Sequence, residues 1–220
     1  MAGGKFELVG VLVRFNLVLR PITHEMYKTK EKQMKKVLLI TSLVILPVNS
    51  LLAASYTVDP GHTYVSFAIN HLGFSTMRGK FDKQSGSLEY DHASKKASVT
   101  IEIDATSIDT GHDKRDQHLI SPDFLNAVEH PTITFKSTKA SWNGNELASV
   151  TGNLTILGVS KPVTLQVNSI KCGEHPFNKK QVCGFDATAS IKRSDFGVNY
   201  GLPAIGEVLD LQIELEASRN

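Results

Sequence analysis

The sequence predicts an all-β protein of about eight antiparallel strands, either closed into a barrel or packed as a sandwich. Apolar and polar residues alternate through most of the chain after residue 55, as in strands with one buried and one wet face. Only residues 107–126 break this pattern with a helical one. The strand-like segments are 65–70, 77–81 leading into 86–90, 97–104, 133–136, 150–156, 163–168, 185–192 and 209–216.

The first of these strands carries an unusual polar residue. Val65, Phe67 and Ile69 share one face, and His71 lies on the same face just before the turn at Gly73. An imidazole at the end of an apolar strand face suggests a pocket with a polar mouth. The alternative is an ordinary core strand in which a backbone carbonyl satisfies His71. Small inward residues on later strands favour a cavity only weakly.

Residues 34–54 are predicted to be a secretory signal peptide. A short basic start at 34–36 precedes an apolar run over 37–46, and small residues follow at Ala53, Ala54 and Ser55. The apolar run is too short for a membrane span. We therefore expect export, with cleavage after one of those three residues and a mature domain over 55–220.

Residues 1–33 precede this signal peptide, although such peptides normally begin near the initiator methionine. We interpret the segment as upstream sequence and Met34 as the true start. The alternative is a genuine N-terminal anchor helix, for which the mostly apolar stretch 8–19 is the candidate.

The only two cysteines, Cys172 and Cys183, flank a turn-rich segment over 173–181. In an exported protein such a pair is expected to form a disulfide, here at the base of a hairpin. The bridge would stabilise the fold by about 3 kcal/mol. A metal site with His175 is the alternative, but it lacks enough ligands at the usual spacings.

The segment over 107–126 is predicted to be a lid. Thr110 is the expected cap of a helix whose first turns carry Asp113 and Asp116. Ser121-Pro122 is expected to start a second short helix. The apolar residues that could close one barrel end are Leu119, Ile120, Phe124 and Leu125.

The sequence gives little support for catalysis or for nucleic-acid binding. The net charge is +2, and no basic patch is interleaved with aromatic residues. The chain has no Gly-x-Ser-x-Gly elbow and no glycine-rich phosphate loop. The histidines lack metalloprotease spacing, so neither a metal site nor a catalytic residue is expected. The six that lie between residues 62 and 130, of eight in the chain, are His62, His71, His92, His112, His118 and His130.

Several motifs together resemble those of the YceI-like family, over about residues 56–217 and in the family's order. They are His62-x-x-Val65-x-Phe67-x-Ile69-x-His71-Leu72-Gly73, Gly79-x-Phe81, Asp109-x-x-His112-x-x-Arg115-Asp116-x-His118-Leu119, Ser121-x-Asp123-Phe124, Pro131-x-Ile133-x-Phe135, Gly152-x-Leu154-Thr155-x-x-Gly158-Val159-x-Lys161-Pro162-Val163 and Asp195-Phe196-Gly197.

The resemblance implies a small periplasmic or secreted protein with an extended lipocalin-like barrel of eight strands, short helices closing one end, and often a dimer. It also implies a long isoprenoid or fatty chain in the barrel tunnel, with quinone precursors as the usual proposal, for transport, storage or sequestration. The expected partners are thus an isoprenoid or fatty amphiphile, a transiently contacted membrane surface and a second copy of the chain. No other cofactor is expected.

The alternation of the strands and this resemblance together suggest ligand contacts. The expected tail contacts all face inward: Val65, Phe67, Ile69, Phe81, Val99, Ile101, Phe135, Leu154 and Ile156. The candidates for the polar head are His71, Arg78, Asp113, Arg115 and His118, of which His71 is best placed.

Two other function classes stay open. One is a stress-induced envelope or interaction protein whose barrel is only a core. The other is a lipid-modifying enzyme that uses His112, Asp113 and His118, although neighbours in sequence need not share hydrogen-bond geometry.

Overall fold

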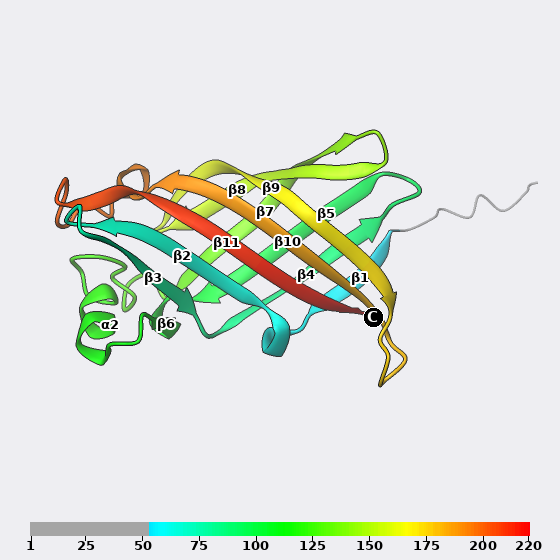
Figure 1. Ribbon diagram of the computed structural model, residues 1–220, viewed down its shortest axis with the longest axis horizontal. Coiled ribbons are helices and arrows are strands. Elements are labelled where there is room, and N and C mark those ends of the chain that lie inside the picture. The colour runs from blue at the N-terminus through cyan, green and yellow to red at the C-terminus, as the bar shows by residue number, and fades with distance from the viewer. Residues whose placement is uncertain (1–52) are drawn as a thin grey trace, which may run out of the picture. The chain divides into compact units, whose positions relative to one another are not determined.

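Alternating apolar and polar residues form eleven strands within residues 53–220, the part of the chain that the computed structural model describes (Figure 1). Residues 1–33 and most of the predicted signal peptide over 34–54 lie outside the described residues. The strands are β1 (Ala54–Val58), β2 (Tyr64–His71), β3 (Ser75–Phe81), β4 (Gln84–Asp91), β5 (Lys96–Asp104), β6 (Ile108–Asp109), β7 (Thr132–Asn143), β8 (Glu146–Ile156), β9 (Val159–Glu174), β10 (Gln181–Lys192) and β11 (Ile205–Arg219).

Eight of these strands form a closed antiparallel ring. Their order is β1-β4-β5-β7-β8-β9-β10-β11, and β11 pairs back with β1. β1 and β2 follow one another along the same edge of β11: residues 217–219 pair with β1 and residues 205–214 pair with β2. β3 and β4 continue this arrangement as their antiparallel partners. The fold is therefore the predicted barrel, and the sandwich alternative is wrong.

The hydrogen-bonded sheet of the barrel wall ends on one side at β6. This short strand pairs with Lys80 and Phe81 of β3, and within residues 53–220 it is the last strand of the sheet order on that side. The chain then leaves the sheet and returns at β7. Residues 110–131, which we call the lid, lie between these strands and include the helix α2 (Asp113–Leu119), seen beside β6 in Figure 1. The end of the barrel that carries the lid is called the lid end. The opposite end, which carries the β9–β10 turn over 175–180, is called the hairpin end.

The lid corrects two expectations. His112 and not Thr110 is the cap of α2, with its Nδ1 accepting from the Arg115 amide at 3.3 Å. Thr110 cannot cap this helix because its amide and hydroxyl both donate to the carboxylate of Asp116. Asp113 and Asp116 do lie in the first turn, near the positive end of the helix dipole.

The second helix expected after Ser121 is also wrong. The amides of Leu125 and Ala127 donate to the carbonyls of Leu119 and Ile120, so the chain folds back on the end of α2 as a series of turns. Phe124 and Ala127 are buried by this arrangement. Among the described residues, no helix has the length and apolar character needed to cross a membrane.

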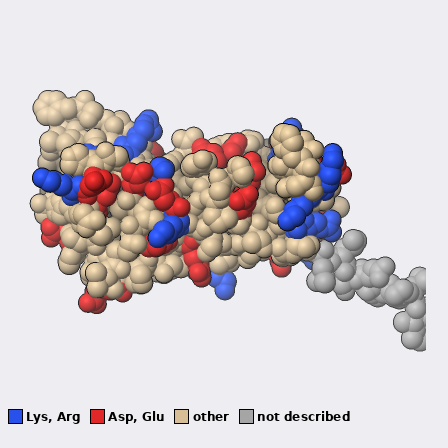
Figure 2. All heavy atoms as spheres, turned by 90° about the horizontal axis from the view of Figure 1, so that it is seen from below, with Lys and Arg blue, Asp and Glu red and all other residues tan. Residues whose placement is uncertain are grey.

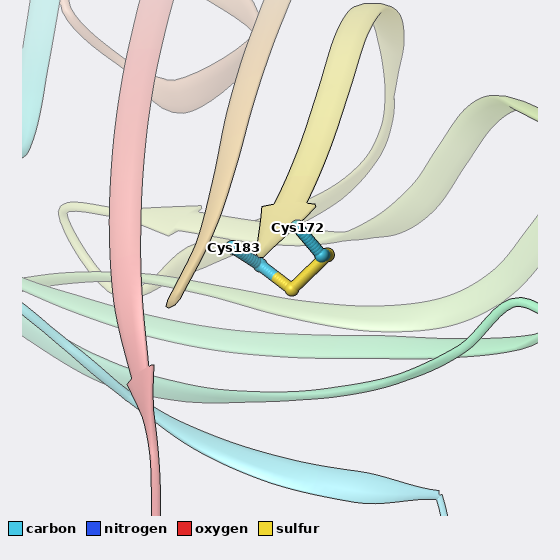
Figure 3. Close-up of a disulfide and its surroundings, with 2 residues drawn as sticks. All are labelled: Cys172 and Cys183. Atoms are coloured by element: carbon cyan, nitrogen blue, oxygen red, sulfur yellow. A yellow bond between two sulfur atoms is a disulfide. The ribbon is translucent and has the colours of Figure 1, made fainter. Parts of the chain in front are cut away.

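The disulfide between Cys172 and Cys183 is present (Figure 3). The two residues are directly opposite in the β9–β10 register, with a Cα–Cα distance of 4.0 Å. Cys183 is fully buried, whereas Cys172 is exposed. The bridge closes the base of the hairpin, as predicted, and the metal alternative is wrong.

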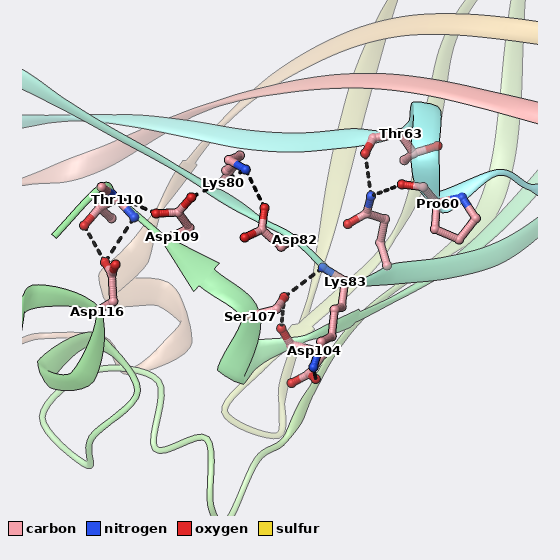
Figure 4. A network of polar contacts seen from close by, with 12 residues as sticks. Pro60, Thr63, Lys80, Asp82, Lys83, Asp104, Ser107, Asp109, Thr110 and Asp116 are labelled. Carbon is pink, nitrogen blue, oxygen red and sulfur yellow. Dashed lines mark hydrogen bonds and ion pairs between the residues drawn. The ribbon is translucent and has the colours of Figure 1, made fainter. Parts of the chain in front are cut away.

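The middle of the barrel is fixed by a polar network where β1 passes into β2 and β3 into β4 (Figure 4). The buried Gln84 amide donates to the carbonyls of Thr63 and Pro60. Lys80 pairs with Asp82 and, at 3.5 Å, with Asp109 at the end of β6. These contacts anchor β6, and with it the start of the lid.

Candidate functional site

A cavity of about 230 Å³ lies in the barrel at the lid end. Its walls come from β2, β3, β5 to β8, β10 and β11, and from the lid and the loop before β11. Most of the lining side chains are apolar. They are Val65, Phe67, Ile69, Met77, Phe81, Ile103, Ile108, Leu119, Phe124, Leu125, Ile133, Leu154, Ile156, Ile191, Val198, Ile205, Leu209 and Leu211, with His71, Arg78, Thr110, Arg115 and Arg193 as the polar members.

A second cavity, of about 80 Å³, lies toward the hairpin end. It has the same apolar character, and the small side chains of Ala97 on β5 and Ala187 on β10 leave it room. Its lining residues are Leu88, Glu89, Tyr90, Ala97, Ser98, Val99, Ile101, Phe135, Leu147, Val150, Leu165, Val167, Phe185, Ala187, Ile213 and Leu215.

The two cavities follow one another along the barrel. Val65 and Ile213 are directly opposite in the β2–β11 register, yet Val65 lines the larger cavity and Ile213 the smaller. Leu154 on β8 and Phe135 on β7 are also directly opposite, and Leu154 lines the larger cavity whereas Phe135 lines the smaller one. A single layer of side chains therefore separates the cavities, which together form one interrupted apolar channel.

The side chains do not fill this channel. Phe67, Leu209 and Leu211 line the larger cavity and are only half-buried, although they face inward. Glycines widen the interior further. A Cβ atom at Gly79 would lie 2.4 Å from Cζ of Phe67, and one at Gly152 would lie 2.6 Å from Cζ of Phe135. The glycines therefore leave the space that the two rings occupy.

Arg115 supplies positive charge to the wall at the lid end. It is half-buried, and its Nε and Nη2 donate to the hydroxyl (2.6 Å) and carbonyl (2.7 Å) of Thr110. Thr110 is held in turn by Asp116. The guanidinium is thus fixed at the cavity wall by the same network that starts the lid.

Arg193 is a second wall arginine, and sequence reasoning missed it. Its side chain is buried and donates to the carbonyls of Gly206, Val198, Tyr200 and Ile205. Burial lowers the pKa of the guanidinium, and the nearby negative charge of Glu207 opposes this shift. Arg193 therefore holds the loop over 197–204 against the barrel and leaves a positive charge beside the cavity. The only sequence signal was its place just before the Asp195-Phe196-Gly197 corner.

The structure places all nine predicted tail residues on the channel. Six line the larger cavity, and Val99, Ile101 and Phe135 line the smaller one. Of the head candidates, His71, Arg78 and Arg115 border the larger cavity, although Arg78 is largely exposed. Their roles as ligand contacts stay predictions.

Asp113 and His118 lie away from the cavity lining. Nε2 of His118 is 2.9 Å from Oδ2 of Asp123, and its ring packs edge-on against those of Phe124 and Tyr200. His118 thus connects the lid to the loop before β11. His112 caps α2, so the three residues of the enzyme alternative have separate surroundings. Within residues 53–220, no three His, Cys, Asp or Glu side chains are placed to hold a metal ion.

Figure 2 shows acidic and basic side chains interspersed along one face of the barrel, with no extended basic surface for a polyanion there. The apolar channel is therefore the feature of the described residues with the clearest capacity to bind a ligand.

Comparisons with known proteins agree with this geometry. A family model described as the YceI-like domain matches residues 56–217. The protein YceI of Escherichia coli is 40% identical over 188 residues, which cover 83% of this chain and 97% of the relative. The crystal structure of BcnA from Burkholderia cenocepacia is similar with a TM-score of 0.63 and 26% identity, over 72% of this chain and 98% of that one.

A more distant solved structure is a polyisoprenoid binding domain from Saccharophagus degradans. It has a TM-score of 0.58 and 16% identity, and the match covers 77% of this chain and 99% of that one. At this identity the likeness shows a shared fold alone.

Proposed function

Because the chain belongs to the YceI-like family, and its barrel encloses an apolar channel, we propose that it holds a long-chain isoprenoid or a related amphiphilic lipid. Quinone precursors fall within this cargo class. The shared fold of the polyisoprenoid binding domain from Saccharophagus degradans supports the same class.

The observation that carries this proposal is the unfilled channel. Protein interiors are normally packed about as densely as organic crystals, so inward apolar side chains facing empty space are unusual. Each cargo methylene moved from water into such a space contributes about 0.8 kcal/mol. A long apolar chain therefore needs no covalent bond or metal ion to bind tightly.

The polar head of the cargo is proposed to lie at the lid end. His71, Arg115 and Arg193 border the larger cavity there, whereas the smaller cavity is bordered mainly by apolar residues. Hydrogen bonds and positive charge at one end would orient the cargo with its tail toward the hairpin end.

We also propose that the protein is exported to the periplasm and that the lid end contacts a membrane surface when cargo is exchanged. Phe74, at the β2–β3 turn, and Val128, in the lid, are 90% and 92% exposed. Burial of these apolar side chains in lipid would stabilise contact between the membrane and the end where cargo enters. Carriage between membranes, storage and sequestration are all compatible with such exchange.

The test is native mass spectrometry of the mature protein purified without detergent from its own periplasm, followed by organic extraction. We expect a stoichiometric adduct that extracts as a polyprenyl or quinone-type lipid. A protein at its bare mass would contradict the proposal and favour an interaction protein with an empty barrel. Recovery in the cytoplasmic fraction with residues 34–54 intact would contradict export.

A further inference from the structure

We infer that Tyr90 closes the hairpin end of the channel and thereby sets the length of chain that the barrel accepts, an inference that rests on the proposed function. Tyr90 is in β4, far from the lid and from every proposed head contact.

The position of Tyr90 is the first observation. Its side chain borders the smaller internal cavity and also a surface pocket of about 340 Å³ at the hairpin end. Within residues 53–220, Leu147 and Val167 are the only other residues that border both. These three side chains form a wall one residue thick between the channel and the outside. The surface pocket is otherwise lined largely by polar residues such as Asn145 and Asn168.

The packing of Tyr90 is the second observation. Its ring lies edge-on to Phe185 at a centroid distance of 5.6 Å and stacks on Trp142 at 6.1 Å. The residues directly opposite in the flanking strands are Ala54 and Ala97. Two alanines give the ring no bulky cross-strand neighbour on either side. The tyrosine ring therefore occupies the part of the wall that its two small cross-strand neighbours leave open.

The electrostatics fit a stop for an apolar chain. Burial raises the pKa of the Tyr90 hydroxyl, so the group stays neutral. Nε1 of Trp142 is buried and has no hydrogen-bond partner within residues 53–220. The neutral hydroxyl is compatible with a hydrocarbon end, and the unpaired Nε1–H of Trp142 is a donor left free in this region.

A length limit follows from this geometry. Affinity should rise about fourfold for each methylene that enters the channel. Once the chain reaches Tyr90, further methylenes stay outside and the affinity should level off. Removing the ring joins the smaller cavity to the surface pocket, so longer chains should gain further affinity.

The experiment measures binding of a polyprenyl alcohol series, from farnesol to undecaprenol, to the delipidated mature protein. Competition in native mass spectrometry gives relative affinities. Trp142 is the only tryptophan in the chain, so its fluorescence reports when a tail reaches the Tyr90 region. The variants are Tyr90→Ala and, as a matched control, Tyr64→Ala, because Tyr64 is an exposed tyrosine on β2.

We expect the wild type and Tyr64→Ala to level off at the same chain length. Tyr90→Ala should bind the next longer alcohol at least about tenfold more tightly relative to that plateau. An unchanged plateau in Tyr90→Ala would overturn the inference while leaving the proposed function intact. If the wild type bound no polyprenyl alcohol of any length, the cargo class itself would be wrong, and the inference with it.

Ala97→Leu should shorten the channel, whereas Tyr90→Ala should lengthen it. It tests the length limit if Tyr90→Ala does not fold. Ala97 lines the smaller cavity, and a leucine there fills part of it. The plateau should move to shorter chains. An unchanged plateau would show that the tail does not reach this cavity, and would overturn the inference.

Discussion

The two ends of the barrel are closed in different ways. At the hairpin end, the strands form a complete hydrogen-bonded ring, a disulfide joins β9 to β10, and aromatic rings pack around a small cavity. At the lid end, β6 stops the sheet early, and turns, one short helix and the loop before β11 complete the wall around a larger cavity. The difference teaches that strand pairing closes the end where the tail would lie, whereas turns and side-chain contacts close the end where cargo would enter.

The largest effect is expected from Arg193→Met, which should destabilise the lid end. The substitution leaves four backbone carbonyls without their guanidinium partner. Loss of buried hydrogen bonds to a charged group predicts about 3 kcal/mol or more of lost stability. Urea unfolding measures this, with the exposed neighbour Lys192→Met as the control. Equal stability of the two variants would show that Arg193 does not hold the loop.

Removing the disulfide should destabilise the hairpin end by a similar or slightly smaller amount. The double substitution Cys172→Ala and Cys183→Ala should lower the free energy of unfolding by about 3 kcal/mol, as measured by urea unfolding. Without the disulfide, the unfolded chain is no longer restricted and has a higher entropy. Polyprenyl binding in native conditions should change little, since neither cysteine lines a cavity. A large loss of binding would show that the two ends are not independent.

A smaller effect is expected at the apolar tips of the two ends. Phe74 and Phe177 are exposed phenylalanines, 90% and 88% accessible, in turns at the lid end and the hairpin end. If the lid end contacts membranes, Phe74→Asp should slow transfer of a fluorescent polyprenol to phosphatidylcholine vesicles by about tenfold, since burial of an apolar side chain is lost. Phe177→Asp should leave the rate unchanged. Equal rates in both variants would contradict the proposed contact.

His71→Ala should weaken cargo binding by roughly fivefold to tenfold if its imidazole hydrogen-bonds the head, because a net hydrogen bond contributes about 1 kcal/mol. The barrel should stay folded, since His71 is only half-buried at a strand end. Thr76→Ala, an exposed neighbour on β3, is the control. Unchanged occupancy in His71→Ala would mean that the residue is only structural.

The smallest effect concerns acid stability of the polar network that anchors the lid. The amide of Gly111 and the ammonium of Lys80 hold the pKa of Asp109 below its ordinary value of 3.8. Its contribution is therefore present above the unfolded-state pKa and is lost as the pH falls through the lower folded-state value. Asp109→Asn should be slightly less stable than the wild type at neutral pH, and the difference should vanish in acid. A difference that persists in acid would contradict this.

The alternation of residues predicted most of the barrel strands and their inward face, but not β1, which closes the ring, or the short strand β6. Val65, Phe67 and Ile69 lie on the channel because side chains of a strand alternate between two faces. The same rule placed Val99 and Phe135 on the smaller cavity.

The lid and the head region could not be predicted in the same way. The cap of α2 moved from Thr110 to His112 because the side chain of Asp116 folds back onto Thr110, a contact that no periodicity encodes. Arg193 was missed because its acceptors are backbone carbonyls, which have no residue-type signal. The division into two cavities depends on how the inward side chains pack, which only the folded structure shows.

The most direct test of the channel is an NMR measurement of where a bound polyprenol lies. The mature protein would carry ¹³C-labelled methyl groups on Ile, Leu and Val, and the cargo would be unlabelled. The account predicts contacts from the cargo to methyls of both cavities, such as Ile69 and Leu211 at the lid end and Val99 at the hairpin end. Contacts confined to an exposed methyl such as that of Val208, with none to the interior, would contradict it.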